Sequence, residues 1–196
     1  MKASLRRREV VRFLLKERGK LLVVAGLGST AWDCTAAGDS PLSFPMWGAM
    51  GTAAMVGLGL ALAQPRRRVL VVTGDGEMLM GLGSLATIGV QKPANLSVVV
   101  IDNERYGETG MQATHTALGV DLAATALACG FRAAVGVGER GELAALRKAI
   151  HAGRGPLFAQ VKVGAEKLAP VLPPREGAVL KARFRRALLG AKADLD

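Results

Sequence analysis

The chain has 196 residues, carries a formal net charge of +10 at pH 7, and is 50% hydrophobic but only 4% aromatic. This length fits one domain with a sizeable core, and two cysteines are too few for a disulfide framework, which is typical of a cytoplasmic protein. The basic residues concentrate toward the chain ends and few aromatic side chains could stack on bases. The composition therefore argues against a nucleic-acid groove, and attraction of anionic small molecules is an equally simple use of the charge.

The first 30 residues are predicted to form a helix, a strand and a glycine loop. Residues 4–18 place apolar side chains on one helical face and arginines on the other, and residues 20–25 form a short apolar strand. The loop of residues 26–30 combines two glycines with two hydroxyl side chains and opens a second helix. Two uses fit it: a phosphate cradle at a helix N-terminus, or an ordinary strand-to-helix connection with Ser29 or Thr30 as N-cap.

A connection and a buried helix are predicted next. Residues 33–45 are rich in turn-forming residues, and residues 49–64 are typical of a helix that Pro65 terminates. The uncharged run of residues 46–64 approaches the length of a membrane span, but it contains four glycines. A helix buried inside the protein is the simpler interpretation, so we expect no membrane association.

The central stretch places two oxygen-bearing side chains at the ends of two buried strands. Residues 69–73 form an apolar strand that breaks at Gly74-Asp75-Gly76, and after a predicted helix over residues 78–90 a second strand, residues 95–101, ends at Asp102-Asn103. Because ligands bind beyond the carboxyl ends of parallel strands, Asp75 and Asn103 are predicted to converge. A carboxylate and a carboxamide, together with phosphate oxygens, suit Mg²⁺.

The remaining elements alternate between helix and strand. Residues 104–118 are predicted to be a mobile active-site loop, and beyond them the pattern predicts a helix (121–129), a strand (132–137), a helix (139–152) and a last strand (156–163). This alternation predicts an α/β fold, a doubly wound parallel sheet with helices on both faces. We expect one domain over residues 1–168 and, over 169–196, a proline-containing linker with a basic helix at 178–189, which either docks on a partner or lies in solvent.

Other common active-site motifs are missing from the sequence. It has no nucleophile elbow, no Walker motif and no complete G-x-G-x-x-G fingerprint. Within the polar loop, His115 fits either a substrate contact or proton relay, or a solvated loop histidine. Glu108 is a weaker candidate on the same grounds. Glu77 lies in the first turn after Gly76, where the helix dipole alone is enough to favour an acidic residue.

Two segments resemble the thiamine diphosphate-dependent enzymes. Residues 74–76, the 26 residues from Glu77 to Asp102, and Asn103 resemble the signature in which GDG is followed at about this distance by two asparagines. Asp102 stands where the first asparagine is usual. Residues 48–51, Gly-Ala-Met-Gly, resemble the family's G-x-M-G segment.

The resemblance implies a role for each matching position. In the family, the signature Asp and last Asn bind Mg²⁺ with a main-chain carbonyl two residues later, which corresponds to Asp75, Asn103 and the carbonyl of Arg105. Gly48 would contact the aminopyrimidine ring and Met50 would support the bent cofactor. The residues expected to bind thiamine diphosphate are Gly28, Ser29, Thr30, Gly48, Met50, Gly74, Gly76, Glu77 and Asn103, and those expected to take part in catalysis are His115 and Glu108.

A narrower likeness points to one branch of the family. Residues 39–61 and 106–110 are similar to the small diphosphate-binding (PP) subunit of sulfopyruvate and phosphonopyruvate decarboxylases. This resemblance implies a subunit of a thiamine diphosphate- and Mg²⁺-dependent lyase that removes carbon dioxide from an anionic 2-oxo acid and releases an aldehyde. The alternatives are a subunit of a 2-oxo acid oxidoreductase or carboligase, and a cofactor-binding module without catalysis.

The resemblance also implies a missing part. In the family, a glutamate from a separate pyrimidine-binding (PYR) domain acts on the aminopyrimidine ring, and a chain of 196 residues filled by the diphosphate half has no room for that domain. We therefore expect a partner subunit of similar size, in a hetero-oligomer that contains dimers of this chain.

Overall fold

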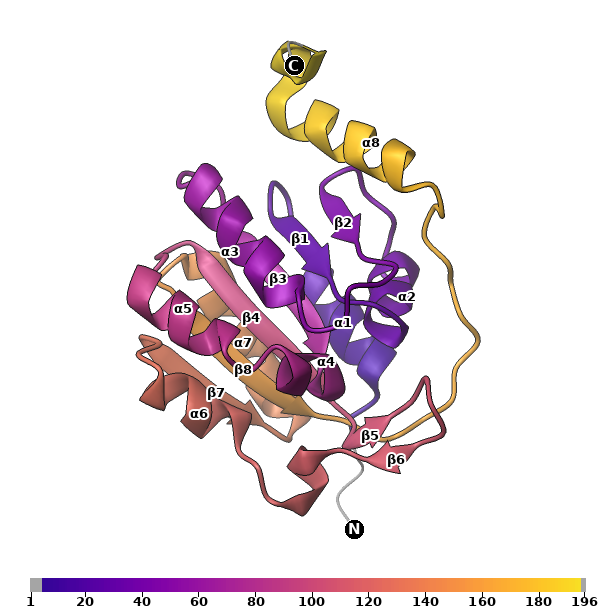
Figure 1. Ribbon diagram of the computed structural model, residues 1–196, viewed down its shortest axis with the longest axis vertical. Coiled ribbons are helices and arrows are strands. Elements are labelled where there is room, and N and C mark those ends of the chain that lie inside the picture. Colours follow the sequence, from indigo (N-terminus) through magenta and orange to yellow (C-terminus); the bar gives the residue numbers. More distant parts are fainter. Residues whose placement is uncertain (1–4, 195–196) are drawn as a thin grey trace.

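The computed structural model describes residues 5–194, which form an α/β structure around a six-stranded parallel sheet (Figure 1). The strand order is β2-β1-β3-β4-β8-β7, so β3 and β4 lie at the centre. The strands are β1 (Leu22–Ala25), β2 (Ser43–Pro45), β3 (Val69–Gly74), β4 (Leu96–Asp102), β7 (Ala133–Val137) and β8 (Leu157–Lys162). The prediction of a parallel, doubly wound sheet is confirmed.

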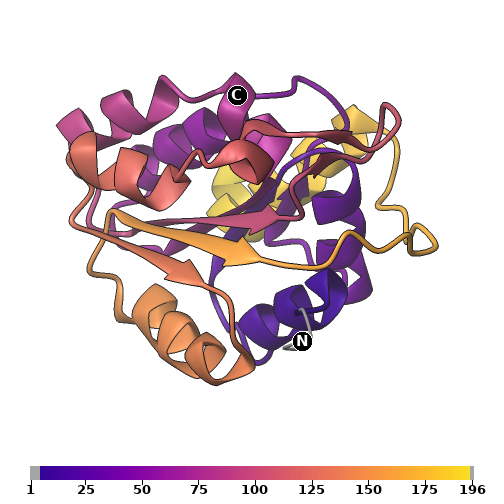
Figure 2. The same ribbon diagram turned by 90° about the horizontal axis from the view of Figure 1, so that it is seen from below.

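Helices cover both faces of the sheet, as Figure 2 shows. One face packs against α1 (Arg7–Leu15), α2 (Ser29–Ala36) and α7 (Leu143–Ala152). The other face packs against α3 (Ala53–Ala63), α5 (Ser84–Gln91) and α6 (Leu122–Ala128). The last helix, α8 (Gly177–Leu189), adds Phe184 to this second side of the core.

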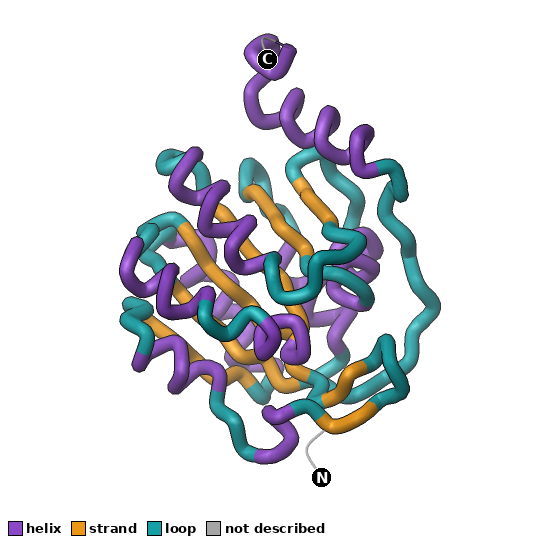
Figure 3. Tube along the Cα trace, in the orientation of Figure 1, coloured by secondary structure: helices purple, strands orange, loops and turns teal. Residues whose placement is uncertain are grey.

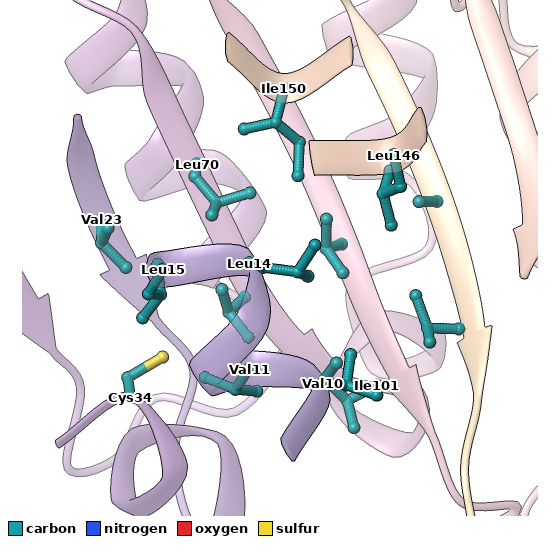
Figure 4. Close-up of a cluster of buried hydrophobic side chains, with 14 of the residues drawn as sticks. Val10, Val11, Leu14, Leu15, Val23, Cys34, Leu70, Ile101, Leu146 and Ile150 are labelled. Carbon is teal, nitrogen blue, oxygen red and sulfur yellow. The ribbon is translucent and has the colours of Figure 1, made fainter. Parts of the chain in front are cut away.

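Alternate strand residues supply the two halves of the core. Along β1 and β3, Val23 and Leu70 face the α1–α2–α7 layer, whereas Val24 and Val71 face the opposite layer. This division follows from the two-residue period of a strand, and most strand residues are apolar because both faces of the sheet are buried. Figure 4 shows the first half, where Leu14 of α1 and Ile150 of α7 meet the sheet.

The single helix expected over residues 78–90 is wrong. The structure has two helices there, α4 (Asp75–Met80) and α5, separated by a turn. At that turn Gly81 lies so close to Gly51 that a β-carbon on Gly81 would overlap the Gly51 carbonyl oxygen. A contact between segments 30 residues apart therefore breaks the helix, and the local pattern could not reveal it.

Two expected loops contain regular structure instead. Residues 33–45 include the end of α2 and the edge strand β2, and residues 104–118 form a two-stranded hairpin, β5 (Arg105–Tyr106) with β6 (Gln112–Ala113), followed by the 3-10 helix η1 (His115–Leu118). The helix expected from residue 49 begins only at Ala53. These elements are too short to show a period in the sequence.

The helices α1 and α8, near the two ends of the described residues, pack against the rest of the domain. Residue 4, where the predicted N-terminal helix starts, lies outside the described residues. The C-terminal helix α8 docks on this chain itself, close to β2, and a long extended connection leads to it from β8 (Figure 3). Across residues 5–194, no helix has both the length and the apolar character required to span a membrane.

Candidate cofactor and metal site

Three loops meet at the carboxyl edge of the sheet, beyond the adjacent strands β1, β3 and β4. The first loop leads from β1 into α2, the second from β3 directly into α4, and the third from β4 into the hairpin. Gly74 at the end of β3 pairs with Ile101 of β4, so the residues that follow both strands lie side by side. This is the edge at which open α/β sheets bind their ligands.

Asp75 is the most buried acid facing this edge, apart from Asp102. It is the first residue of α4 and only 2% exposed. Thr114 donates its hydroxyl hydrogen to Asp75 Oδ2 over 2.6 Å. Burial raises the pKa of Asp75 to about 6, the Thr114 hydroxyl lowers it, and the neighbouring Asp102 carboxylate raises it further. None of these influences is a cation, so an ionised Asp75 is a buried charge stabilised by hydrogen bonds alone.

Asn103 and Arg105 lie directly beside this carboxylate. The backbone of Asn103 hydrogen-bonds to the Asp75 carboxylate. The Asn103 side chain accepts a hydrogen bond from the backbone N–H of Arg105 over 3.0 Å, and Arg105 begins β5. The three residues that the signature implies as metal ligands are therefore neighbours in space, although 27 residues separate Asp75 from Asn103.

Asp102, the residue that departs from the usual signature, has partners suited to an acid. It is fully buried, and its Oδ2 accepts hydrogen bonds from Gln160 Nε2 over 2.6 Å and from Lys162 Nζ over 2.8 Å. Both partners belong to β8, and Lys162 also pairs with Glu104 over 2.7 Å. A buried carboxylate requires a charged partner, and Lys162 provides one.

Two threonines connect the two buried carboxylates. Thr116 Oγ1 lies 2.8 Å from Asp102 Oδ1 and 2.9 Å from Thr114 Oγ1, which in turn contacts Asp75. These three contacts need three protons, but two hydroxyl groups supply only two. All three contacts can therefore be hydrogen bonds at the same time only when one of the two carboxyl groups carries the third proton. This agrees with the raised pKa of Asp75.

The glycine loop opens α2 without a side-chain cap. Its N-cap is Gly28, with a φ of 67°, so the expectation that Ser29 or Thr30 caps this helix is wrong. Thr30 instead donates its hydroxyl hydrogen back to the Gly26 carbonyl over 2.9 Å. The first backbone N–H groups of α2 are thus left for another acceptor, which is what the phosphate-cradle interpretation requires.

A buried ion pair holds this loop from behind. Arg7 of α1 donates to the Ser29 carbonyl over 3.2 Å and pairs with Asp33 of α2. Arg8 pairs with the other oxygen of Asp33 over 2.8 Å. The start of α2 is therefore fixed to α1 by two cations on one buried carboxylate.

Glu77 lies inside the protein between two of the loops. Its Oε2 accepts a hydrogen bond from the Thr73 hydroxyl over 2.8 Å, and it is so close to Gly26 that a β-carbon there would overlap it. Burial raises the pKa of Glu77, while the Thr73 hydroxyl and the backbone of Ala53 lower it. The side chain thus ties the loop after β1 to the end of β3.

The segment resembling G-x-M-G covers the turn after β3. The Met50 Cε atom lies 3.5 Å from the position that a β-carbon on Gly76 would occupy, so Met50 rests on the GDG turn. Gly48 is exposed, with no atom within 4 Å of where its β-carbon would lie. Met50 therefore borders the turn after β3, whereas Gly48 lies exposed on the same loop.

The two candidate catalytic residues lie at the outer side of the site. His115 is the exposed first residue of η1, between the buried Thr114 and Thr116. Glu108, in the hairpin tip, reaches the glycine loop: its Oε1 lies 2.6 Å from where a β-carbon on Gly28 would be. The structure thus places Glu108, rather than His115, over the glycine loop.

Four residues that the sequence did not single out belong to the site: Thr114, Thr116, Gln160 and Lys162. The threonines alternate around His115, and the other two are the only polar side chains of β8. Polar residues at the carboxyl end of an otherwise apolar buried strand are the signal that could have identified Gln160 and Lys162.

Comparison with known proteins identifies the sequence family. Residues 30–161 match the family described as thiamine pyrophosphate enzyme, C-terminal TPP binding domain. The chain is 46% identical over 110 residues to sulfopyruvate decarboxylase subunit beta of Methanothermobacter thermautotrophicus, covering 56% of this chain and 58% of that subunit. It is 41% identical over 167 residues to phosphonopyruvate decarboxylase of Streptomyces hygroscopicus, covering 83% of this chain and 40% of that enzyme.

The fold has a counterpart among solved structures. Benzoylformate decarboxylase from Polynucleobacter necessarius superposes with a TM-score of 0.67 at 21% identity, over 85% of this chain and 34% of that one. The similarity extends over about a third of that enzyme, and over 58% and 40% of the two relatives in sequence. The family match over residues 30–161 includes the loops that follow β3 and β4.

Proposed function

The chain belongs to the thiamine pyrophosphate enzymes through their C-terminal TPP binding domain, and we propose that it is the diphosphate-binding subunit of a heteromeric 2-oxo acid decarboxylase. The substrate would be an anionic 2-oxo acid similar to sulfopyruvate or phosphonopyruvate, and the products would be carbon dioxide and an aldehyde. The observation that carries this proposal is the buried Asp75 carboxylate beside Asn103, at the edge bordered by the glycine loop and Met50.

The residues present fit Mg²⁺. Asp75 offers a carboxylate that lacks a cation, Asn103 offers a carboxamide, and the Arg105 carbonyl is the third expected ligand. These are oxygen donors, and they are few, which suits an ion that completes its shell with water and phosphate oxygens. The ion would also compensate the buried charge of Asp75.

The remaining loops fit a diphosphate and its attached ring system. The uncapped N–H groups at the start of α2, around Gly28 and Ser29, would donate hydrogen bonds to the phosphate oxygens. Met50 would contact the cofactor from above the Gly74–Gly76 turn. Bound thiamine diphosphate would supply a nucleophilic carbon and an electron sink for the electron pair that the departing carbon dioxide leaves behind. Glu108 and His115 are the candidates for proton transfer at the mouth of the site.

A partner subunit is part of the proposal. The Methanothermobacter relative is itself named as a beta subunit, and in the Streptomyces relative the matching region is 40% of a longer chain. We propose that the PYR domain, with the glutamate that acts on the aminopyrimidine, comes from a second subunit in the cytoplasm. Dimers of this chain would form part of the hetero-oligomer.

The test is reconstitution with a co-expressed PYR-domain partner. Calorimetry should show binding of thiamine diphosphate that requires Mg²⁺, and a coupled dehydrogenase assay should show aldehyde release from sulfopyruvate or phosphonopyruvate. Asp75→Ala should abolish the Mg²⁺-dependent binding, whereas Glu17→Gln, at an exposed acid in the turn before β1 and so at the opposite edge of the sheet, should leave it intact. Cofactor binding without aldehyde release from either acid would refute the decarboxylase assignment, and turnover by this chain alone would refute the need for a partner.

A further inference from the structure

The C-terminal segment, residues 164–189, begins at the carboxyl edge of the sheet, where β8 ends. It finishes with α8, which packs beside β2 and pairs with Asp39 before the amino end of that strand. It leaves β8 beside the N-terminal segment, where Gly164 donates its backbone hydrogen bond to the Leu5 carbonyl over 2.8 Å and Arg8 reaches the Ala169 carbonyl over 2.8 Å. Figure 1 shows this connection along one side of the molecule, with α8 at its end. The segment lies outside residues 30–161, which match the family.

This segment contacts β2 and the residues on both sides of it. Before β2, Asp39 forms a two-bond ion pair with Arg183, at 2.5 and 3.1 Å. Within β2, the Phe44 ring meets the Phe184 ring edge to face, with centroids 5.6 Å apart. After β2, the indole N–H of Trp47 donates to the Pro174 carbonyl over 2.8 Å.

These contacts fall where the strand has little other support. β2 is three residues long and lies at the sheet edge, paired only with β1. The residues that follow it, 47–50, are exposed, and Ala49 has a positive φ of 58° although it is not glycine. Such a backbone conformation persists only when its surroundings impose it.

The same loop faces the cofactor site. It contains Gly48 and Met50, and Met50 rests on the Gly74–Gly76 turn. We infer that the C-terminal segment is a positioning element for cofactor binding. The ion pair of Arg183 with Asp39 fixes the start of the β2 region, and the hydrogen bond from Trp47 to the Pro174 carbonyl fixes its end. Together these two contacts fix the conformation of residues 46–52. This inference rests on the proposed function, because it assigns the loop to thiamine diphosphate.

The ion pair and the indole hydrogen bond lie near the surface, so the expected effects are moderate. Removing either contact should weaken thiamine diphosphate binding by about threefold to tenfold, the range that a partly exposed two-bond ion pair or hydrogen bond can produce. Amide exchange across residues 46–52 should accelerate by a similar factor.

The experiment compares four single variants of the chain in its complex with the PYR-domain partner. Arg183→Ala removes the ion pair, Arg183→Lys keeps the charge without the paired geometry, and Trp47→Phe keeps a ring without the N–H donor. Lys181→Ala is the matched control, because it removes an exposed cation from the same helix. Titration with thiamine diphosphate at saturating Mg²⁺ gives the affinity, and hydrogen–deuterium exchange of the cofactor-free complex gives the loop protection.

The inference predicts faster exchange over residues 46–52 and weaker cofactor binding in Arg183→Ala and Trp47→Phe, an intermediate effect in Arg183→Lys, and no effect in Lys181→Ala. It is overturned if the variants match the control in either measurement, or if exchange accelerates across the whole sheet rather than in this loop. If the unmodified complex binds no thiamine diphosphate, the proposed function fails, and this inference fails with it.

Discussion

Replacing Asp75 by Asn should stabilise the metal-free chain at alkaline pH. Burial raises the pKa of Asp75 to about 6 from 3.8, so the folded state binds this proton more tightly than the unfolded state does. The stability that the proton contributes is fully present below pH 3.8 and is lost as the pH rises through 6. A shift of this size corresponds to on the order of 3 kcal/mol, at about 1.4 kcal/mol for each pKa unit.

Asn keeps an oxygen acceptor for the Thr114 hydroxyl but has no carboxyl group to ionise. The free energy of unfolding of Asp75→Asn should therefore equal that of the original chain near pH 4 and exceed it by about 1 to 3 kcal/mol at pH 8. Urea denaturation without divalent metal, followed by circular dichroism from pH 4 to pH 8, measures the difference. Asp121→Asn is the control, since asparagine also caps helices well.

A difference between Asp75→Asn and the original chain that stays constant over this pH range would refute the argument. So would a variant that is less stable at pH 8, because Asp75 would then gain more from its hydrogen bonds than it loses by burial. Addition of Mg²⁺ and thiamine diphosphate should reverse the order of stability, since the neutral amide of Asn lacks the charge that binds the metal most strongly.

Three further predictions concern other buried positions. Burial raises the pKa of Cys34 to about 12, so iodoacetamide at pH 8 should leave this thiol unmodified in the folded chain and alkylate it in urea; mass spectrometry that finds it alkylated in the folded chain would contradict this. Asp102→Asn should lower the free energy of unfolding by about 1 to 3 kcal/mol, because Lys162 and Gln160 lose their carboxylate acceptor. The exposed Glu176→Gln is the surface control, and an unchanged urea midpoint in Asp102→Asn would show that an amide at position 102 serves Lys162 and Gln160 as well as the carboxylate does. Gly81→Ala should lower the thermal midpoint by several degrees, because the added methyl group overlaps the Gly51 carbonyl. A higher midpoint, as an ordinary helix-favouring substitution would give, would contradict the close approach of these two segments.

The sequence alone was sufficient to predict the parallel sheet and the place of the candidate site at its carboxyl edge. Short, mainly apolar runs such as residues 69–73 and 95–101, bounded by turn residues, are typical of buried strands of a parallel sheet, and the pairing of β3 with β4 brings Asp75 and Asn103 together at their ends. This argument needs only local pattern and the geometry of parallel strands. It holds whatever the helices between the strands do in detail.

The parts that sequence reasoning missed depend on contacts between distant segments. The break at Gly81 is imposed by the Gly51 backbone, and the partners of Asp102 come from β8, 58 and 60 residues later in the chain. No local periodicity records such contacts. The docking of α8 on β2 is of the same kind, because Asp39 and Arg183 are separated by 144 residues.

The place of α8 also has a consequence for biosynthesis. β2 precedes α8 by more than 130 residues, so a growing chain presents the outer edge of β2 and the ring of Phe44 uncovered until α8 is made. Open strand edges invite pairing with other molecules. A chain released before α8 would therefore be prone to self-association, and α8 protects the finished chain by covering this edge.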